Sequence, residues 1–124
     1  MQAKILRHDA SKEYFFQEGC YIKELSNHPG DRELSIAQAR VKPGVTTLLH
    51  RLDQTAERYC IIAGEGVVEI EGLPAQSVAA GDVVLIPPGY SQRIRNSGDE
   101  DLIFLALCTP RFEPQNYIEL QESE

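Results

Sequence analysis

The chain has 124 residues and a mass of 13.9 kDa, which is enough for one domain with a core of its own. Its 42% apolar and 25% charged residues are typical of a globular protein and exclude a disordered tail. The net charge of −7 argues against a nucleic-acid partner, and no apolar run is long enough for a membrane-spanning helix. We therefore expect one soluble domain over residues 1–124, with neither a nucleic-acid nor a membrane partner.

The N-terminal residues and the cysteines indicate a cytoplasmic protein. The first residues contain no apolar region of the kind found in secretory signals. The three cysteines, Cys20, Cys60 and Cys108, are odd in number and far apart, which argues against a disulfide framework. We expect free thiols in a reducing compartment.

Short apolar segments separated by turn signals follow one another along the chain. Near the N-terminus, Tyr14–Phe16 and Cys20–Ile22 are candidates for strands that join a neighbouring subunit. Clusters of Gly, Pro, Asn and Asp mark the reversals farther along, and many short strands between such turns indicate an all-β sandwich or barrel. The further strands are predicted at residues 34–41, 46–52, 58–64, 67–72, 82–87, 92–96 and 102–108.

The patterns within these strands predict which faces are covered. Val83–Ile86 and Ile103–Leu107 are continuous apolar runs, which predict strands shielded on both sides. Gln38 and Arg40 alternate with apolar residues, and we expect the apolar set to face inward, with Arg40 on the surface. In the opposite phase, Arg40 would bind an anionic group of a ligand inside the barrel.

Two groups of residues stand at fixed spacings in the middle of the chain. The first, at residues 44–66, has Gly44, His50, Glu57 and Gly64; the second, at residues 81–96, has Gly81, Pro87, Gly89 and Asn96. These spacings resemble the two motifs of the cupin family, G-x5-H-x-H-x(3,4)-E-x6-G and G-x5-P-x-G-x2-H-x3-N. The resemblance implies an all-β double-stranded β-helix, a small jelly-roll cupin barrel with a pocket in its mouth.

The candidate site residues follow from these motifs. Side chains two apart on a strand share a face, so His50 lies with Leu52 and Glu57 with Tyr59. In cupins that bind a metal, histidines and the glutamate hold the ion, but Leu52 and Gln92 stand here where the family has its second and third histidines. The resemblance leaves His50, Glu57 and Gln92 as metal ligands for zinc, manganese, iron or nickel, and it is equally compatible with no metal.

Without a metal, Glu57 beside His50 would favour the imidazolium form and give an acid–base pair. Glu57, His50 and Tyr59 are then the candidate catalytic residues, with Glu57 as the base. We expect a small polar metabolite as the ligand and an isomerase- or lyase-type reaction rather than oxygenase chemistry. The alternative is a non-catalytic ligand-binding protein whose metal site has decayed at Leu52 and Gln92.

Two expectations concern the assembly and the C-terminus. Open jelly rolls expose strand edges, and cupins commonly form dimers, so we expect a homodimer. Residues 110–124 contain two prolines and end acidic. They form either an arm laid across the barrel or a partner by Phe112 and Tyr117, or a partly ordered surface tail.

Overall fold

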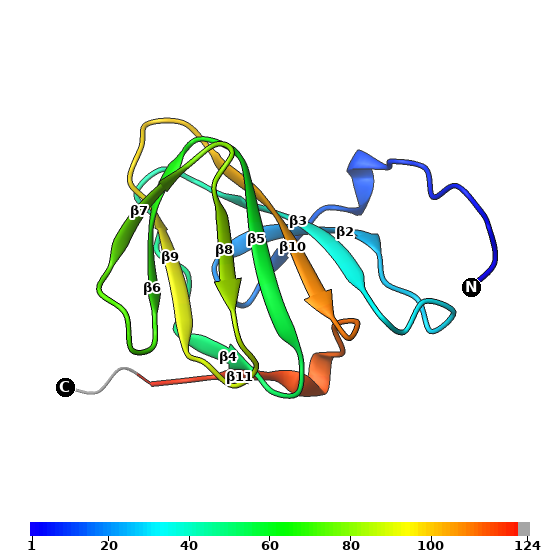
Figure 1. The fold of residues 1–124 in the computed structure, drawn as a ribbon. Coiled ribbons are helices and arrows are strands. Elements are labelled where there is room, and N and C mark those ends of the chain that lie inside the picture. The colour runs from blue at the N-terminus through cyan, green and yellow to red at the C-terminus, as the bar shows by residue number, and fades with distance from the viewer. Residues whose placement is uncertain (122–124) are drawn as a thin grey trace.

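The computed structural model describes residues 1–121 and consists of two antiparallel sheets that face each other (Figure 1). The six-stranded sheet has the order β1 (Tyr14–Phe16), β2 (Cys20–Ser26), β3 (Ser35–Val41), β10 (Leu102–Thr109), β5 (Ala56–Ala63) and β8 (Val83–Ile86). The five-stranded sheet has the order β11 (Tyr117–Glu119), β4 (His50–Leu52), β9 (Gln92–Asn96), β6 (Glu65–Ile70) and β7 (Gln76–Ala79). Two short 3-10 turns, η1 (Ala10–Lys12) and η2 (Pro114–Asn116), complete the described elements.

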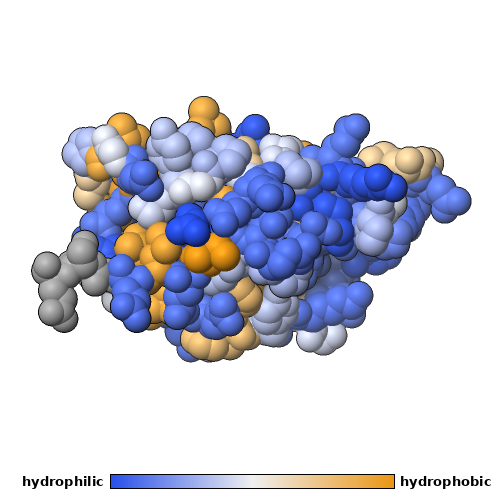
Figure 2. Space-filling view, turned by 90° about the horizontal axis from the view of Figure 1, so that it is seen from below, coloured by the Kyte–Doolittle hydropathy of each residue, from blue (hydrophilic) through white to orange (hydrophobic). Residues whose placement is uncertain are grey.

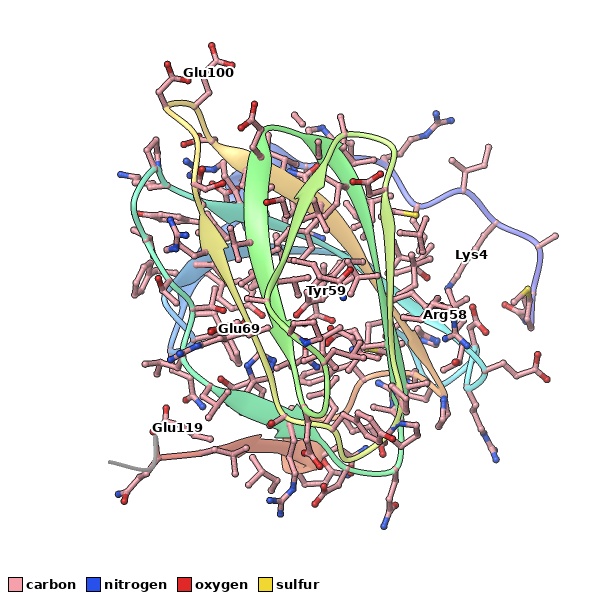
Figure 3. The ribbon with its side chains drawn as sticks, turned by 60° about the vertical axis from the view of Figure 1, so that its left-hand side comes forward. Lys4, Arg58, Tyr59, Glu69, Glu100 and Glu119 are labelled. Atoms are coloured by element: carbon pink, nitrogen blue, oxygen red, sulfur yellow. The ribbon has the colours of Figure 1, made fainter. Side chains whose placement is uncertain are left out.

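This architecture confirms the predicted all-β jelly roll. Inward-facing side chains alternate along the strands and fill the space between the sheets, as the period of two in a strand requires. Tyr59 lies between the sheets, with its ring centroid 4.3 Å from that of Phe104 (Figure 3). The core around this pair includes Val41, Ile61, Ile94 and Leu102.

The turn from β5 to β6 passes very close to β10, and glycine at position 64 makes this possible. Gly64 has a φ of +85°, which side-chain-bearing residues rarely adopt. A Cβ atom placed there would lie 2.6 Å from the backbone oxygen of Asp101. The last glycine of the first motif is therefore required by backbone geometry and has no chemical role in the site.

The prediction that Val83–Ile86 is shielded on both sides is wrong. Val83 and Leu85 are 56% and 67% exposed, whereas Val84 and Ile86 are buried in the core. The reason is that in a two-sheet sandwich only the inner face of a strand meets the other sheet, and β8, as the last strand of its sheet, has a neighbouring strand on one side only. In β10, which lies in the middle of the sheet, Ile103 and Leu105 on the outer face are half-buried, so that run is also only partly shielded there.

The N-terminal segment pairs within its own chain. β1 and β2 form a hairpin, and β2 lies alongside β3, with Tyr21 opposite Arg40. These strands therefore occupy the edge of the chain's own sheet, where we had expected them to add to a neighbouring subunit.

Arg40 faces outward, as the favoured phase predicts. Its Nη2 lies 2.7 Å from Glu13 Oε1 and its Nη1 lies 3.2 Å from Asp101 Oδ2. The guanidinium carbon sits 4.4 Å from the centroid of the Tyr21 ring, a cation–π contact on the outer face of the sheet. Arg40 is thus paired at the surface and is not an anion-binding group in the barrel.

The C-terminal segment is an arm on the barrel rather than a loose tail. β11 pairs with β4, with Tyr117 opposite Leu52 and Glu119 opposite His50. Of the two alternatives for residues 110–124, the pairing of β11 with β4 corresponds to the arm, and residues 122–124 lie outside the described part of the chain. Within residues 1–121, no helix has the length and hydropathy needed to cross a membrane.

Candidate functional site

A cavity of about 70 Å³ lies where the N-terminal hairpin and the C-terminal arm meet the barrel. Its wall takes side chains from both sheets, including Phe16 of β1, Ile22 of β2, Ala106 of β10 and Tyr117 of β11. One water molecule needs roughly 10–15 Å³ measured in this way, so the cavity has room for several waters or one small molecule. The underside of the barrel, near β4 and β11, is mostly hydrophilic, with the largest group of hydrophobic residues left of the centre and smaller ones at the upper edge (Figure 2).

His50 presents one ring nitrogen to this cavity. The side chain is 2% exposed, and its Nδ1 donates a hydrogen bond to the Leu48 carbonyl oxygen at 2.9 Å. Because a carbonyl can only accept, the neutral ring carries its proton on Nδ1 and a lone pair on Nε2. Burial lowers the pKa of His50, outweighing the opposite effects of the Leu48 carbonyl and Glu57. Glu57 does favour the imidazolium form, as expected, but desolvation is the larger effect, so the net shift of the His50 pKa is downward.

Glu57 brings a buried carboxyl group into the cavity wall from the start of β5. Its Oε2 lies 3.9 Å from the Cys108 thiol, which donates to it, but its Oε1 has no hydrogen-bond partner among the described residues. Burial raises the pKa of Glu57 to about 7; the Glu18 carboxyl group adds to that rise, whereas the neighbouring His50, Gln92 and Cys108 side chains oppose it. The carboxyl group therefore titrates close to neutral pH.

Gln92 and Tyr59 form a pair behind the cavity. Gln92 lies opposite His50 in the β4–β9 pairing, and the Tyr59 hydroxyl donates a hydrogen bond to Gln92 Oε1. Gln92 Nε2 is buried with no hydrogen-bond partner in the described residues. Neither side chain is among the described residues that line the cavity. The structure thus brings His50 and Glu57 to the cavity and leaves the other two predicted site residues next to it.

These groups do not fit a metal centre of the family's kind. Within residues 1–121, no three His, Cys, Asp or Glu side chains are grouped closely enough to hold a metal ion. Leu52 is buried where the family has a histidine, and the Gln92 oxygen that would complete the set already accepts from Tyr59. Zinc and iron sites need several nitrogen, sulfur or carboxylate ligands on one point. Any reaction in this cavity is therefore assigned to the side chains themselves.

Glu18 is a site residue that the sequence analysis did not identify. It lies in the turn between β1 and β2, where a glutamate before a glycine is normally exposed, yet its side chain is only 11% exposed. The turn is held against the chain leading into β4, because the Leu48 N–H donates to the Glu18 carbonyl oxygen at 2.8 Å. Glu18 Oε2 then lies 3.8 Å from His50 Nε2, and burial raises the pKa of Glu18 to about 8.

Tyr117 of the C-terminal arm covers one face of the His50 ring. The two rings are stacked, with centroids 4.9 Å apart and planes inclined by 19°. Phe16 packs edge-on against Tyr117 at 5.2 Å. The N-terminal hairpin and the C-terminal arm, which are far apart in the sequence, therefore close the cavity together.

Comparison with known proteins agrees with this architecture. The sequence model of the family described as "Cupin domain" matches residues 37–108, and the chain belongs to the cupin family. An uncharacterized protein of Methanocaldococcus jannaschii, MJ1618, is 31% identical over 112 residues, which is 88% of each chain.

Two further similarities are to proteins of Thermotoga maritima. One is named an oxalate-binding protein and is 38% identical over 71 residues, covering 57% of this chain and 58% of the relative. The other is the crystal structure of a predicted oxalate decarboxylase, with a TM-score of 0.67 and 30% identity over 73% of this chain and 80% of that one.

Proposed function

We propose that this chain binds a small polar metabolite in the cavity and moves a proton on it, with Glu57 as the base. The observation that carries the proposal is the buried Glu57 Oε1, which lies in the cavity wall without a hydrogen-bond partner among the described residues. A carboxyl group kept in this way is costly to bury unless a ligand uses it. The proposed metabolite would be the hydrogen-bond partner of this carboxyl group.

The neighbouring groups support proton transfer of the isomerase or lyase type. A base works best when its pKa is near the working pH, and the pKa of Glu57 is raised to about 7. In the proposed step, Glu57 takes a proton from a carbon next to a carbonyl group, and the electron pair of the broken C–H bond moves onto the carbonyl oxygen. The Glu18 carboxyl group, whose pKa of about 8 keeps it protonated at neutral pH, supplies a proton to that oxygen, and its Oε2 lies 3.8 Å from His50 Nε2.

Tyr59 takes no part in this step, because its hydroxyl is directed to Gln92. Burial also raises the pKa of Tyr59 well above its ordinary value, which makes the hydroxyl a weak acid. We assign Tyr59 and Gln92 to positioning the strands behind the cavity, in place of the catalytic role and the ligand role expected from the sequence.

A second candidate function is ligand binding without a reaction. It is favoured by Leu52, which is 4% exposed and puts an apolar side chain where the family has a histidine. At the other position where the family has a histidine, the side-chain oxygen of Gln92 already accepts a hydrogen bond from Tyr59. In this case, Glu57 and His50 would only hold the ligand.

Deuterium exchange separates the two candidates. Hydroxyacetone, pyruvate and aminoacetone are small carbon acids that differ in charge, and each is incubated with the protein in D₂O and followed by ¹H NMR. We expect the wild type to introduce deuterium next to the carbonyl of at least one of them. The Glu57→Gln variant should lose about 100-fold or more of that rate, a typical contribution of a general base.

Glu100→Gln is the matched control, because Glu100 is an exposed glutamate at the end of the barrel away from Glu119 (Figure 3). The Glu100→Gln variant should introduce deuterium into the probe at the wild-type rate. Binding of a probe with exchange no faster than in Glu57→Gln would refute catalysis and leave the ligand-binding function. Failure of every probe to bind or exchange would refute both.

A further inference from the structure

Among residues 1–121, the carboxyl groups of the cavity have no lysine or arginine to balance them. Glu18, Glu24 and Glu57 all line it, whereas no lysine or arginine does so among residues 1–121. His50 is the one basic side chain of the described wall, and burial lowers its pKa. A carboxylate inside a protein needs a cation or several hydrogen bonds to remain charged. The described part of the chain therefore does not supply the positive charge that would balance the carboxyl groups of the cavity.

The rest of the wall is aromatic and apolar. Tyr14, Phe16 and Tyr117 line the cavity together, with Tyr14 and Phe16 edge-on at 6.4 Å between centroids and Phe16 and Tyr117 at 5.2 Å. Aromatic rings attract cations through their electron-rich faces, and aromatic pockets are used to hold organic ammonium groups. A metal ion would instead need several oxygen or nitrogen ligands on one point, and within residues 1–121 no three His, Cys, Asp or Glu side chains are grouped in that way.

From these two observations, we propose that the ligand of this cavity is a small organic cation, an amine in its ammonium form, held between the Glu57 carboxylate, the Glu18 carboxyl group and the aromatic wall. The inference rests on the proposed function and adds the charge class of the ligand. The ammonium group supplies the missing partner of Glu57 Oε1, and the alkyl part contacts Phe16 and Tyr117. Burial raises the pKa of both glutamates, as expected for carboxyl groups whose cation is absent.

The same charges argue against a dianion. One relative is named an oxalate-binding protein. Oxalate in this cavity would face Glu18 and Glu57 at close range without an arginine or lysine in the described wall. Like charges in a site of low polarity repel each other strongly. We therefore infer that this chain selects the charge opposite to that of oxalate.

A series of probes matched in size tests the inference. Ethylammonium, ethanol and acetate have nearly the same number of heavy atoms and carry charges of +1, 0 and −1, and oxalate adds a charge of −2. Each is titrated into ¹⁵N-labelled wild-type protein, and the amide resonances of Glu18, His50 and Glu57 report occupation of the cavity. We expect ethylammonium to bind at least 10-fold more tightly than any of the other three.

The double variant Glu18→Gln Glu57→Gln keeps the shape of the site and removes both charges. We expect it to bind ethylammonium at least 10-fold more weakly than the wild type and to lose the preference for ethylammonium over ethanol. The Glu100→Gln control should keep both. The wild-type charge series tests the inference by itself if the double variant does not fold.

The outcomes separate this inference from the proposed function. Tighter binding of ethanol, acetate or oxalate would overturn the cation inference and leave a ligand-binding cavity in place. Displacement of ethylammonium by equimolar Zn²⁺ would assign the cavity to a metal ion and overturn it as well. If no probe moves the cavity resonances, both the inference and the proposed function are wrong.

Discussion

Replacing Glu18 by glutamine should stabilise the protein at neutral and alkaline pH. Glu18 is a buried carboxyl group whose pKa burial raises from 4.5 to about 8. Ionising it in the folded state costs free energy that the unfolded chain does not pay. Glutamine has nearly the same shape and cannot ionise, so the Glu18→Gln variant avoids this cost.

The size of the effect follows from the displacement of the pKa. One pH unit of displacement corresponds to about 1.4 kcal/mol, so the rise from 4.5 to about 8 corresponds to about 5 kcal/mol. The folded pKa lies above the unfolded one, so the favourable contribution is complete below pH 4.5 and is lost as the pH rises through 8. The advantage of the variant should therefore be near zero at pH 4.5, about 3 kcal/mol at pH 7 and about 5 kcal/mol at pH 9. A domain has only about 5–15 kcal/mol of stability in total.

Urea unfolding followed by circular dichroism at pH 5, 7 and 9 measures this difference. The Glu100→Gln control removes the same charge from an exposed position, and it corrects for the change in net charge. An advantage of Glu18→Gln that is equal at pH 5 and pH 9 after this correction would refute the reasoning, because it would mean that Glu18 ionises as easily in the folded chain as in the unfolded one.

Four further outcomes are expected. The Gly64→Ala variant should lose about 3 kcal/mol or more in urea unfolding, because it adds a clash to an unfavourable φ, whereas Gly72→Ala, with a φ of +80° and open space, should lose only about 1 kcal/mol. Tyr117→Phe should gain about 1 kcal/mol in the same assay, because it removes a buried hydroxyl that has no partner among the described residues. Leu52→His should retain zinc through gel filtration when measured by elemental mass spectrometry, because it adds a second imidazole beside His50, and equal zinc in the wild type would contradict this. Light scattering should give twice 13.9 kDa if the predicted homodimer forms, and a mass of 13.9 kDa at micromolar concentration would exclude it.

The sequence-based predictions succeeded where local patterns control the backbone. Spaced glycines and prolines predicted the turns, and the apolar segments between them correspond to β3, β4, β5, β6, β8, β9 and β10. The resemblance to the cupin motifs also pointed to His50 and Glu57, which line one cavity. These features depend on residues close together in the chain, for which the allowed φ values and the alternation of side chains are informative.

Predictions about the surroundings of a residue were less successful. The run Val83–Ile86 indicated two covered faces, but the apolar pattern contains no information about which strand ends a sheet. The charge state of His50 was misjudged because the depth of burial, and not the neighbouring carboxylate, dominates its pKa. Glu18 was missed altogether, since nothing within the turn distinguishes it from a surface glutamate.

The amino-acid sequence by itself therefore determined the β-strands and their turns, and its resemblance to the cupin motifs pointed to the two residues that face the cavity. Only the tertiary structure decided what surrounds those residues. It brings Glu18 from the N-terminal hairpin and Tyr117 from the C-terminal arm to His50, across most of the length of the chain. The physical reason is that desolvation and charge balance depend on every group within a few ångströms, and such groups are set by strand pairing between distant segments.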